Sequence, residues 1–436
     1  MTGLQEVPVS RAGSRSIARI LILTLGSRGD VQPYVALGGG LARRGHAVTV
    51  STGQGFDALI ADHGLRPDPL SIDIPALMES KEIRAALTSL RGRLATFRSM
   101  RQMMQQQLDE MADKVSAATP DIVVYNIKAF VAPYLARAHG VLAIPGCLQP
   151  AFMPTGAFPF PLARLPDLGA WSNRLMARAF IGLMGVSYRA MLRAWLKRHT
   201  EVAARPPLDV LRGYHPRGAA IPRLHAHSAA LVPKPADWEP DDHVTGAWFL
   251  PTHETWDMPD DLAAFLEAGP PPVYFGFGSM PAVDAERTAE TVMKAIAASK
   301  VRAIVARGWG ALAAATGSPA IHVLDKAPHD RLFPHCAAVV HHGGAGTTHE
   351  GLRWGCPTLV CPVFGDQPFW GDVVAGKGAG PTPIRLKGMK ADDLTAALTT
   401  LQTDAVRRSA AGLAEAIQKE DGINRAADLI ETASAR

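Results

Sequence analysis

The residues best suited to chemistry stand in one short stretch, VVHHGGAGTTHEGLRWG, at positions 339–355. Two adjacent histidines end an apolar run, and glycines and threonines separate them from a helical pattern. Backbone N–H groups at the start of a helix are unpaired and carry partial positive charge, so they bind anions. Glycines let a ligand approach the backbone closely, and hydroxyl groups add donors. We therefore predict a phosphate-binding turn formed by His342, Gly344, Gly346, Thr347 and Thr348.

Two other interpretations of this stretch are weaker. A zinc site would need both histidines on one side, but adjacent residues at the end of a strand point to opposite faces. No pair of closely spaced cysteines completes a ligand set either. A turn without a ligand would need only one glycine or threonine to cap the helix. The chain also has no Asp-x-Asp motif, and we expect no metal at the site.

Two more turns follow apolar runs in the same half of the chain. FGFGS offers Ser279 as a second phosphate donor, although many strands end in such a turn without binding anything. FGDQPFWGD places Asp366 beside Gln367, and an acceptor next to an amide suits recognition of neighbouring sugar hydroxyls. Trp370 completes this predicted sugar-binding set. Asp366 can also cap the helix that follows, and the two roles are compatible.

A similar glycine turn, LGSRGDVQP, follows the first apolar run of the chain. Its spacing is not that of a dinucleotide-binding fingerprint. Asp30 in this turn is either the cap of the following helix, expected from about Val31 to Arg44, or a general base. Burial makes a carboxylate a stronger base. Ser27 and Arg28 flank Asp30, and we expect both to lie beside the substrate that loses the proton.

These turns need strands and helices to hold them. Short apolar runs alternate with helical stretches, which indicates a parallel, doubly wound sheet. The alternation starts again in the second half of the chain, so we predict an α/β fold with two such domains facing a central cleft. The predicted strands are 18–25, 46–52, 121–126, 141–147, 272–278, 302–308, 321–325, 337–343 and 357–362.

Changes in composition set the expected domain boundaries. A Pro- and Trp-rich stretch with little periodicity separates the two halves of the chain. We expect the helix at the C-terminus to be able to cross back to the first domain. The expected segments are a flexible tail 1–16, a first domain 17–240, a linker 241–264, a second domain 265–420 and the C-terminal helix 421–436.

An insert in the first domain has a composition of its own. Residues 150–166 are rich in proline and phenylalanine, and residues 171–200 contain no acidic side chain. The simplest interpretation is a surface helix that covers the core. The alternatives are an apolar ligand pocket and a helix that rests on an anionic membrane. Gly182 and Gly185 argue against one continuous helix. One side of the helix has Arg174, Arg178, Arg189, Arg193 and Lys197, and the other has Phe180, Met184, Tyr188, Met191 and Trp195.

The composition of the whole chain excludes several classes of protein. The chain has 436 residues, of which 47% are hydrophobic and 19% charged, with a net charge of +5. The length exceeds one ordinary core, and the mild basic excess predicts no nucleic-acid partner. Four cysteines without a CxxC pair indicate reduced thiols and a cytoplasmic location. No apolar run has the length of a membrane span, and residues 1–15 lack the apolar core of a signal peptide. The sequence predicts no oligomeric state.

Together these motifs resemble a known family. HHGGAGTT, GCP and PVFGDQPFWGD are similar to the donor-binding signature of family 1 glycosyltransferases of the GT-B fold. The branch nearest in pattern is the sterol 3-β-glucosyltransferase type, including its bacterial members. GSRGDVQPYVALGGGLARRGHAVTVST and PTGAFPFPLA resemble the same branch. The resemblance implies two Rossmann-like domains, with the acceptor bound by the N-terminal one and a nucleotide sugar by the C-terminal one.

The resemblance also implies roles for residues around the donor. The diphosphate contacts His342, not His341, together with the turn at 346–347 and Ser279. The pair of Asp366 and Gln367 holds the sugar hydroxyls.

The nucleoside half of the donor is implied in the same way. The backbone of Ala327 pairs with the edge of the base, and Glu350 holds the ribose in plant members. Those members have a tryptophan at the position of Lys326, and Trp309 is the candidate substitute here.

The base of the reaction departs from the plant pattern. Plant relatives have a histidine at the position of Asp30, assisted by a later aspartate, and the matching later stretch here offers Asn126. This agrees with bacterial members in which the aspartate of GSRGD is assigned the role of base. The acceptor-side residues we expect are Ser27, Arg28, Asn126, Phe152, Phe158, Met184 and Tyr188.

The reaction this implies is inverting, metal-independent transfer of a sugar, glucose from UDP-glucose, to a hydroxyl of a lipophilic acceptor such as a sterol or related terpenoid. We expect no cofactor beyond the nucleotide-sugar co-substrate, and the partners are small molecules, with peripheral membrane contact left open. One alternative is transfer from a dTDP- or UDP-sugar to a macrolide, polyketide or peptide aglycone. Others are an epimerase or hydrolase of nucleotide sugars, which would not need the apolar insert, and a nucleotide-sugar sensor without turnover.

Overall fold

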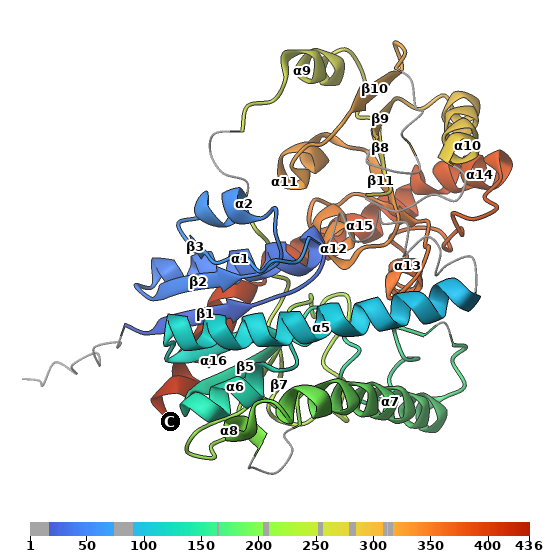
Figure 1. Ribbon diagram of the computed structural model, residues 1–436. Coiled ribbons are helices and arrows are strands. Elements are labelled where there is room, and N and C mark those ends of the chain that lie inside the picture. Colours follow the sequence, from blue (N-terminus) through green and yellow to red (C-terminus); the bar gives the residue numbers. More distant parts are fainter. Residues whose placement is uncertain are drawn as a thin grey trace, which may run out of the picture.

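Two parallel sheets form the centres of two α/β domains (Figure 1). The sheet of the N-terminal domain has the strand order β3-β2-β1-β4-β5-β6-β7, and that of the C-terminal domain has the order β10-β9-β8-β11-β12. The fold class predicted from the sequence is confirmed. The computed structural model describes residues 17–73, 90–163, 165–203, 209–251, 256–278, 285–307, 312 and 317–436.

Nine of the described strands fall where short apolar runs predict them, within two residues at each end. In the first sheet the strands are β1 (Arg19–Leu23), β2 (Ala47–Ser51), β3 (Arg66–Pro67), β4 (Ile122–Asn126), β5 (Leu142–Cys147), β6 (Arg223–His225) and β7 (Asp242–Val244). In the second they are β8 (Val273–Gly276), β9 (Ala303–Ala306), β10 (Ile321–Leu324), β11 (Ala338–His341) and β12 (Thr358–Val360).

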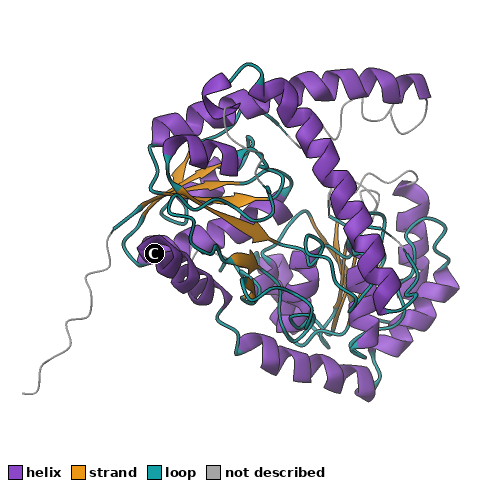
Figure 2. Cartoon of the chain, turned by 90° about the horizontal axis from the view of Figure 1, so that it is seen from below, coloured by secondary structure: helices purple, strands orange, loops and turns teal. Residues whose placement is uncertain are grey.

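Helices surround both sheets (Figure 2). In the N-terminal domain they are α1 (Arg28–Arg43), α2 (Asp57–Ala61), α5 (Leu90–Ala118), α6 (Ala132–His139), α7 (Ala170–Leu196) and α8 (Thr200–Ala203). Those that follow are α9 (Asp260–Glu267), α10 (Ala285–Ser299), α11 (His329–Leu332), the 3-10 helix η1 (Phe333–His335), α12 (Ala345–Arg353), α13 (Gln367–Gly376), α14 (Ala391–Leu401), α15 (Asp404–Gln418) and α16 (Gly422–Ala435).

The apolar runs are continuous because the sheets are covered on both faces. In β1, Ile20 and Ile22 pack into the core beneath α1 and α16. Leu21 and Leu23 point the other way, into the core that includes residues of α5, α6 and α7. A strand covered on both faces leaves no position for a polar side chain, so the functional residues come after the strands.

The last helix, α16, packs against α1 of the N-terminal domain (Figure 1). Ile423 lies where a side chain at Gly40 would have to be, which explains one glycine of the GGG run inside α1. Arg44 donates to Asp428 at 2.6 Å and to Glu431 at 3.2 Å. The chain therefore leaves the second domain through α15 and closes the core of the first.

Several sequence expectations differ from the structure. The strands β3, β6 and β7 were not predicted, because each has only two or three residues, and β7 lies inside the predicted linker 241–264. α9 begins inside that linker as well and packs on the second domain through Leu262. α7 is one continuous helix in spite of Gly182 and Gly185, because neither glycine requires a bend and neighbouring residues pack on the domain.

α7 also corrects the expectation about membrane spans. It is one helix in the described part of the chain with the length and composition to cross a membrane. Its most apolar window has a mean hydropathy of 1.2, and 11% of that window is buried. Apolar and basic residues alternate along α7, which hides the apolar excess from a search for unbroken apolar runs.

Candidate active site

Each predicted site segment follows the carboxyl end of a parallel strand, where such sheets bind ligands. Because β1 pairs with β4, the turns after Leu23 and Asn126 lie side by side. Because β11 lies between β8 and β12, the turns after Gly276, His341 and Val360 also converge. The topology thus gathers five distant segments into two groups, one in each domain.

The two histidines of the glycine turn have different environments. His341 ends β11 and is fully buried, and its Nδ1 accepts a hydrogen bond from the backbone N–H of Gly343 at 3.0 Å. His342 is half-buried, and its ring lies against Gly278 of the neighbouring turn. Its Nδ1 is buried without a hydrogen-bond partner among the described residues. Burial lowers the pKa of His342 to about 4, so the ring is neutral at neutral pH and suited to a neutral hydrogen bond with a ligand.

The backbone of the turn leaves room for an anion at the start of α12. Gly344 is the N-cap of the helix. A side chain at Gly343, whose φ is 95°, would strike Val360 and Gln367, whereas a side chain at Gly346 would meet nothing within 4 Å. Packing within the protein therefore does not require glycine at 346, and an approaching ligand would explain it.

The two threonines of the turn are not equivalent. Thr347 is half-buried, at the mouth of the turn. Thr348 is fully buried, and its hydroxyl donates to the backbone carbonyl of Gly344 at 3.0 Å. The prediction that Thr348 donates to phosphate does not fit this placement, because its proton is used inside the helix.

Asp30 is held by the turn that begins α1. Ser27 is the N-cap, and Asp30 occupies the third helical position, so the sequence interpretation of Asp30 as the cap is wrong. One carboxylate oxygen accepts from the backbone N–H of Ser27 at 2.9 Å and from its hydroxyl at 3.3 Å. A side chain at Gly26, whose φ is 138°, would collide with this carboxylate. The glycine before the serine is therefore required for Asp30 to fold back over the turn.

Lys128 contacts Asp30 from the neighbouring strand end, and sequence reasoning missed it. Its Nζ lies 2.6 Å from the second carboxylate oxygen of Asp30. Asn126 does not reach Asp30 by a recorded hydrogen bond. Its side-chain oxygen accepts from the backbone N–H of Lys128 at 2.9 Å and so fixes the turn that presents the lysine. The signal in the sequence was the position of Lys128, two residues after β4.

The predicted sugar-binding residues form the start of α13. Asp366 is the N-cap and accepts from the indole N–H of Trp370 at 2.9 Å. The side-chain oxygen of Gln367 accepts from the backbone N–H groups of Val363 and Phe364. Trp370 is fully buried, so it lies behind Asp366 and has no surface for a sugar. Trp370 therefore does not contact the sugar as predicted. Its role is to position Asp366.

The two groups of residues face each other across the domains. Burial raises the pKa of Asp366, and the negative charge of Asp30 adds to that effect while the positive charge of Lys128 opposes it. On the other side of the site, burial lowers the pKa of His329 to about 4, and the positive charge of Arg28 contributes. N-terminal residues that flank the candidate base thus lie within electrostatic reach of C-terminal residues.

Two known domain families match the two halves of this arrangement. The glycosyltransferase family 28 N-terminal domain matches residues 20–145, and the erythromycin biosynthesis protein CIII-like, C-terminal domain matches residues 271–421. Two sterol 3-beta-glucosyltransferases of Arabidopsis thaliana, UGT80A2 and UGT80B1, are 33% and 34% identical over 93% and 95% of this chain. The chain belongs to the GT-B glycosyltransferases of family 1, in the sterol 3-beta-glucosyltransferase-like branch.

This glycosyltransferase spans 64% and 68% of the length of those two relatives. A solved structure, the glycotransferase of kitacinnamycin, matches it with a TM-score of 0.68 at 21% identity. That match covers 96% of this chain and 99% of the other, and it shows the fold.

The nucleoside side of the glycosyltransferase is described in part. Ala327 is half-buried between β10 and α11. Glu350 on α12 is buried and accepts from the indole N–H of Trp354 at 2.8 Å, and burial raises its pKa. Ser279 and Trp309 lie outside the described residues. Their predicted contacts with phosphate and base stay predictions.

The predicted acceptor residues lie on the inner side of the insert. Tyr188 of α7 stacks on Phe130, with ring centroids 4.4 Å apart, and Phe130 follows Lys128 by two residues. Phe158 packs against Phe369 of α13, so it bridges the two domains. Phe152 and Met184 pack in the cluster beneath the insert. The apolar inner side of α7 therefore reaches the segment that carries Lys128.

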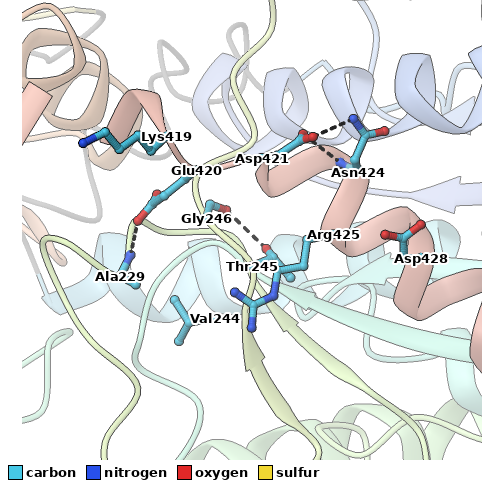
Figure 3. Close-up of a pocket in the computed structure, with 10 residues that line it drawn as sticks. All are labelled: Ala229, Val244, Thr245, Gly246, Lys419, Glu420, Asp421, Asn424, Arg425 and Asp428. Carbon is cyan, nitrogen blue, oxygen red and sulfur yellow. Dashed lines mark hydrogen bonds between the residues drawn. The ribbon is translucent and has the colours of Figure 1, made fainter. Parts of the chain in front are cut away.

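A pocket of about 380 Å³ lies elsewhere, at the crossover from α15 to α16 (Figure 3). Glu420 in its wall accepts from the hydroxyl of Ser228 at 2.9 Å and from the backbone N–H of Ala229 at 2.8 Å. None of the predicted site residues lines this pocket. It belongs to the connection between the domains and not to the candidate active site.

Proposed function

We propose that this glycosyltransferase transfers glucose from UDP-glucose to a hydroxyl of a lipophilic acceptor, a sterol or related terpenoid, with inversion and without a metal ion. The observations that carry the proposal are that Ser27 and Lys128 hold Asp30 at the strand ends of one domain, and that Phe158 of this domain packs on Phe369, three residues after Asp366 of the other domain. A group that removes a proton and a group suited to sugar hydroxyls then lie on opposite sides of one reacting centre. The identity to sterol 3-beta-glucosyltransferases supports the acceptor class.

The residues divide the reaction between them. Asp30 takes the proton of the acceptor hydroxyl while that oxygen forms a bond to the anomeric carbon. The bond from this carbon to the diphosphate breaks on the opposite face, which inverts the configuration. The leaving diphosphate keeps the electron pair, and its charge is stabilised by His342 and by the backbone N–H groups at the start of α12. Asp366 and Gln367 orient the sugar.

Lys128 has a separate role in this scheme. Its ammonium group keeps Asp30 pointed into the cleft and shares the charge of the carboxylate. Lys128 is thus a positioning residue for the base.

Replacing the base tests the proposal directly. We expect Asp30→Ala and Asp30→Asn to lower kcat by roughly 100-fold to 10,000-fold, the range expected for loss of a general base. The affinity for UDP, measured by calorimetry, should stay within a factor of two. Transfer that survives either substitution would show that another group removes the proton. A protein that only senses nucleotide sugars would bind UDP and show no transfer in the unaltered chain.

A second candidate function keeps the chemistry and changes both substrates. The match to an erythromycin biosynthesis domain favours a natural-product aglycone, and the donor in this candidate is a dTDP- or UDP-sugar. A panel of sterols, terpenoids, macrolides and small polar acceptors distinguishes the two when it is run with UDP-glucose, UDP-galactose and dTDP-glucose and read by mass spectrometry. Products only on small polar acceptors would contradict both candidates. We further propose a reducing compartment, in keeping with four free cysteines of which three are buried.

A further inference from the structure

Most of the exposed large apolar side chains in the described part of the chain lie on the outer side of α7 or in the segment just before it. Of ten large apolar side chains that are exposed, six lie between residues 162 and 186. Trp171 is 79% exposed and Leu183 is 63% exposed. A contiguous apolar patch of this kind marks an interaction surface. Its members are Leu162, Leu168, Trp171, Leu175, Leu183 and Val186.

The other side of α7 packs against the rest of the N-terminal domain. Ala177, Leu192 and Trp195 are buried, and Tyr188 stacks on Phe130. A helix that spans a bilayer would be free of the domain on more of its circumference. α7 is therefore placed to lie along a surface and not to cross it.

Basic side chains lie on the same outer side of α7, toward its C-terminal end. Arg189 and Arg193 follow Trp171 and Leu175 by about five turns of helix, which returns them to the same side, and Lys197 follows one turn later. All three are exposed, and none forms an ion pair with a described residue. Arg174 and Arg198 are paired, with Asp237 and Asp109. Arg178 is exposed as well and, like Arg189, Arg193 and Lys197, has no ion pair with a described residue. These unpaired cations are therefore available to an outside anion.

We propose that the outer side of α7 docks on a lipid bilayer that carries anionic headgroups. The exposed apolar side chains from Trp171 to Val186 would enter the boundary between headgroups and acyl chains, and the exposed basic side chains would contact the anionic headgroups. A second copy of the chain fits less well, because α7 has no acidic residue and would bring like charges together. A single flat membrane surface would contact both the apolar and the basic side chains on the outer side of α7.

The purpose of this docking rests on the proposed function, but the binding does not. A lipophilic acceptor dissolves in the bilayer, and the inner side of α7 reaches the segment that carries Lys128. Docking would hold the acceptor side of the cleft near the membrane that supplies the substrate.

Vesicle flotation tests the docking. The full chain is mixed at low salt with vesicles of phosphatidylcholine alone or of phosphatidylcholine with phosphatidylserine. The apolar variant is Leu183→Ser with Val186→Ser, and its control is Ile17→Ser, an exposed apolar residue away from α7. The charge variant changes Arg189, Arg193 and Lys197 to Gln. Its control changes three exposed cations of the C-terminal domain to Gln, Lys387, Arg407 and Arg408.

The unaltered chain should bind the anionic vesicles more tightly than the neutral ones, and high salt should weaken that binding. We expect the charge variant to lose roughly 100-fold in partition onto anionic vesicles, from about fivefold for each basic side chain near the surface. The apolar variant should lose at least roughly tenfold on both kinds of vesicle. Both controls should bind as the unaltered chain does.

Three outcomes would overturn the proposal: no binding to either vesicle, equal loss in a variant and its control, or a dimer that the α7 variants dissociate. Transfer to an acceptor delivered in detergent should be unchanged in both α7 variants. If the chain binds vesicles but transfers no sugar, the proposed function is wrong and the proposed docking is still supported.

Discussion

At the scale of single residues, the geometry of the base depends on Lys128. Asp30 receives donors on both oxygens, two from Ser27 and one from Lys128, whose side chain is 52% exposed. We expect Lys128→Met to lower kcat by roughly 10-fold to 100-fold, a part of what a well-placed base contributes. The affinity for UDP should stay unchanged, because Lys128 contacts the base and not a residue of the predicted phosphate-binding turn.

Conservative replacement separates this role from a structural one. Lys128→Arg keeps the charge and should recover most of kcat. Urea unfolding should show the Met variant to be as stable as the unaltered chain within about 1 kcal/mol, because the ion pair is partly exposed. An equal fall in kcat in the Met and Arg variants would contradict the role assigned to the lysine.

At the scale of elements, two adjacent residues at the start of α12 have different predicted roles. One contributes to stability and the other to UDP binding. Thr348→Val removes a buried hydroxyl that donates to Gly344, so it should cost about 1 kcal/mol of stability and leave the affinity for UDP unchanged. Thr347→Ala should leave stability unchanged and weaken UDP binding by roughly fivefold, the value of one lost hydrogen bond. Urea unfolding and calorimetry with UDP measure both quantities. The reverse pattern would show that Thr348 faces the ligand.

The elements themselves were largely predictable from the sequence. Apolar runs covered on both faces, such as that of β1, mark strands by composition alone. Glycine turns follow β1, β8 and β11, and ligand binding at these turns stays a prediction. Short strands such as β6 and β7 carry too few residues to show a pattern. α7 was predicted as broken because glycine is a poor helix former, but packing on the domain outweighs that preference.

Within the site, sequence reasoning failed where a side chain has a choice of partners. Thr348 and Trp370 have the chemistry of ligand-binding groups, but the hydroxyl of Thr348 donates to Gly344 and the indole N–H of Trp370 donates to Asp366. Lys128 was missed for the converse reason. A lysine after a strand has no distinctive pattern, and only the pairing of β1 with β4 brings it to Asp30.

At the scale of the whole molecule, a few polar contacts join the domains. The ring of His349 on α12 accepts from the backbone N–H of Ser228 at 3.1 Å, and Glu420 accepts from the hydroxyl of the same serine. Burial lowers the pKa of His349 to about 4. A neutral ring is the form that accepts this hydrogen bond, so protonation would break a contact between the domains.

Acid should therefore destabilise the folded chain at a mildly acidic pH. His329, His342 and His349 each have a folded-state pKa of about 4, against an ordinary value of 6.5. Between these pH values the unfolded chain binds protons on these histidines and the folded chain does not. The free energy of unfolding therefore falls as the pH falls from about 6.5 toward about 4. The raised pKa values of Glu350, Asp366 and Glu420 act in the opposite direction and soften the fall.

Urea unfolding at pH 7, 6 and 5 measures this balance. The midpoint should fall at each step, because histidines with lowered pKa values outnumber carboxyl groups with raised ones. The pKa is lowered in the same direction for His225, His227, His243 and His341. His342→Gln removes one of these titrating rings and should make the decline shallower. A Lys387→Gln variant is the matched control, since this exposed lysine does not titrate in the range. A midpoint that is constant from pH 7 to pH 5 would show that the buried rings do not govern the response to acid.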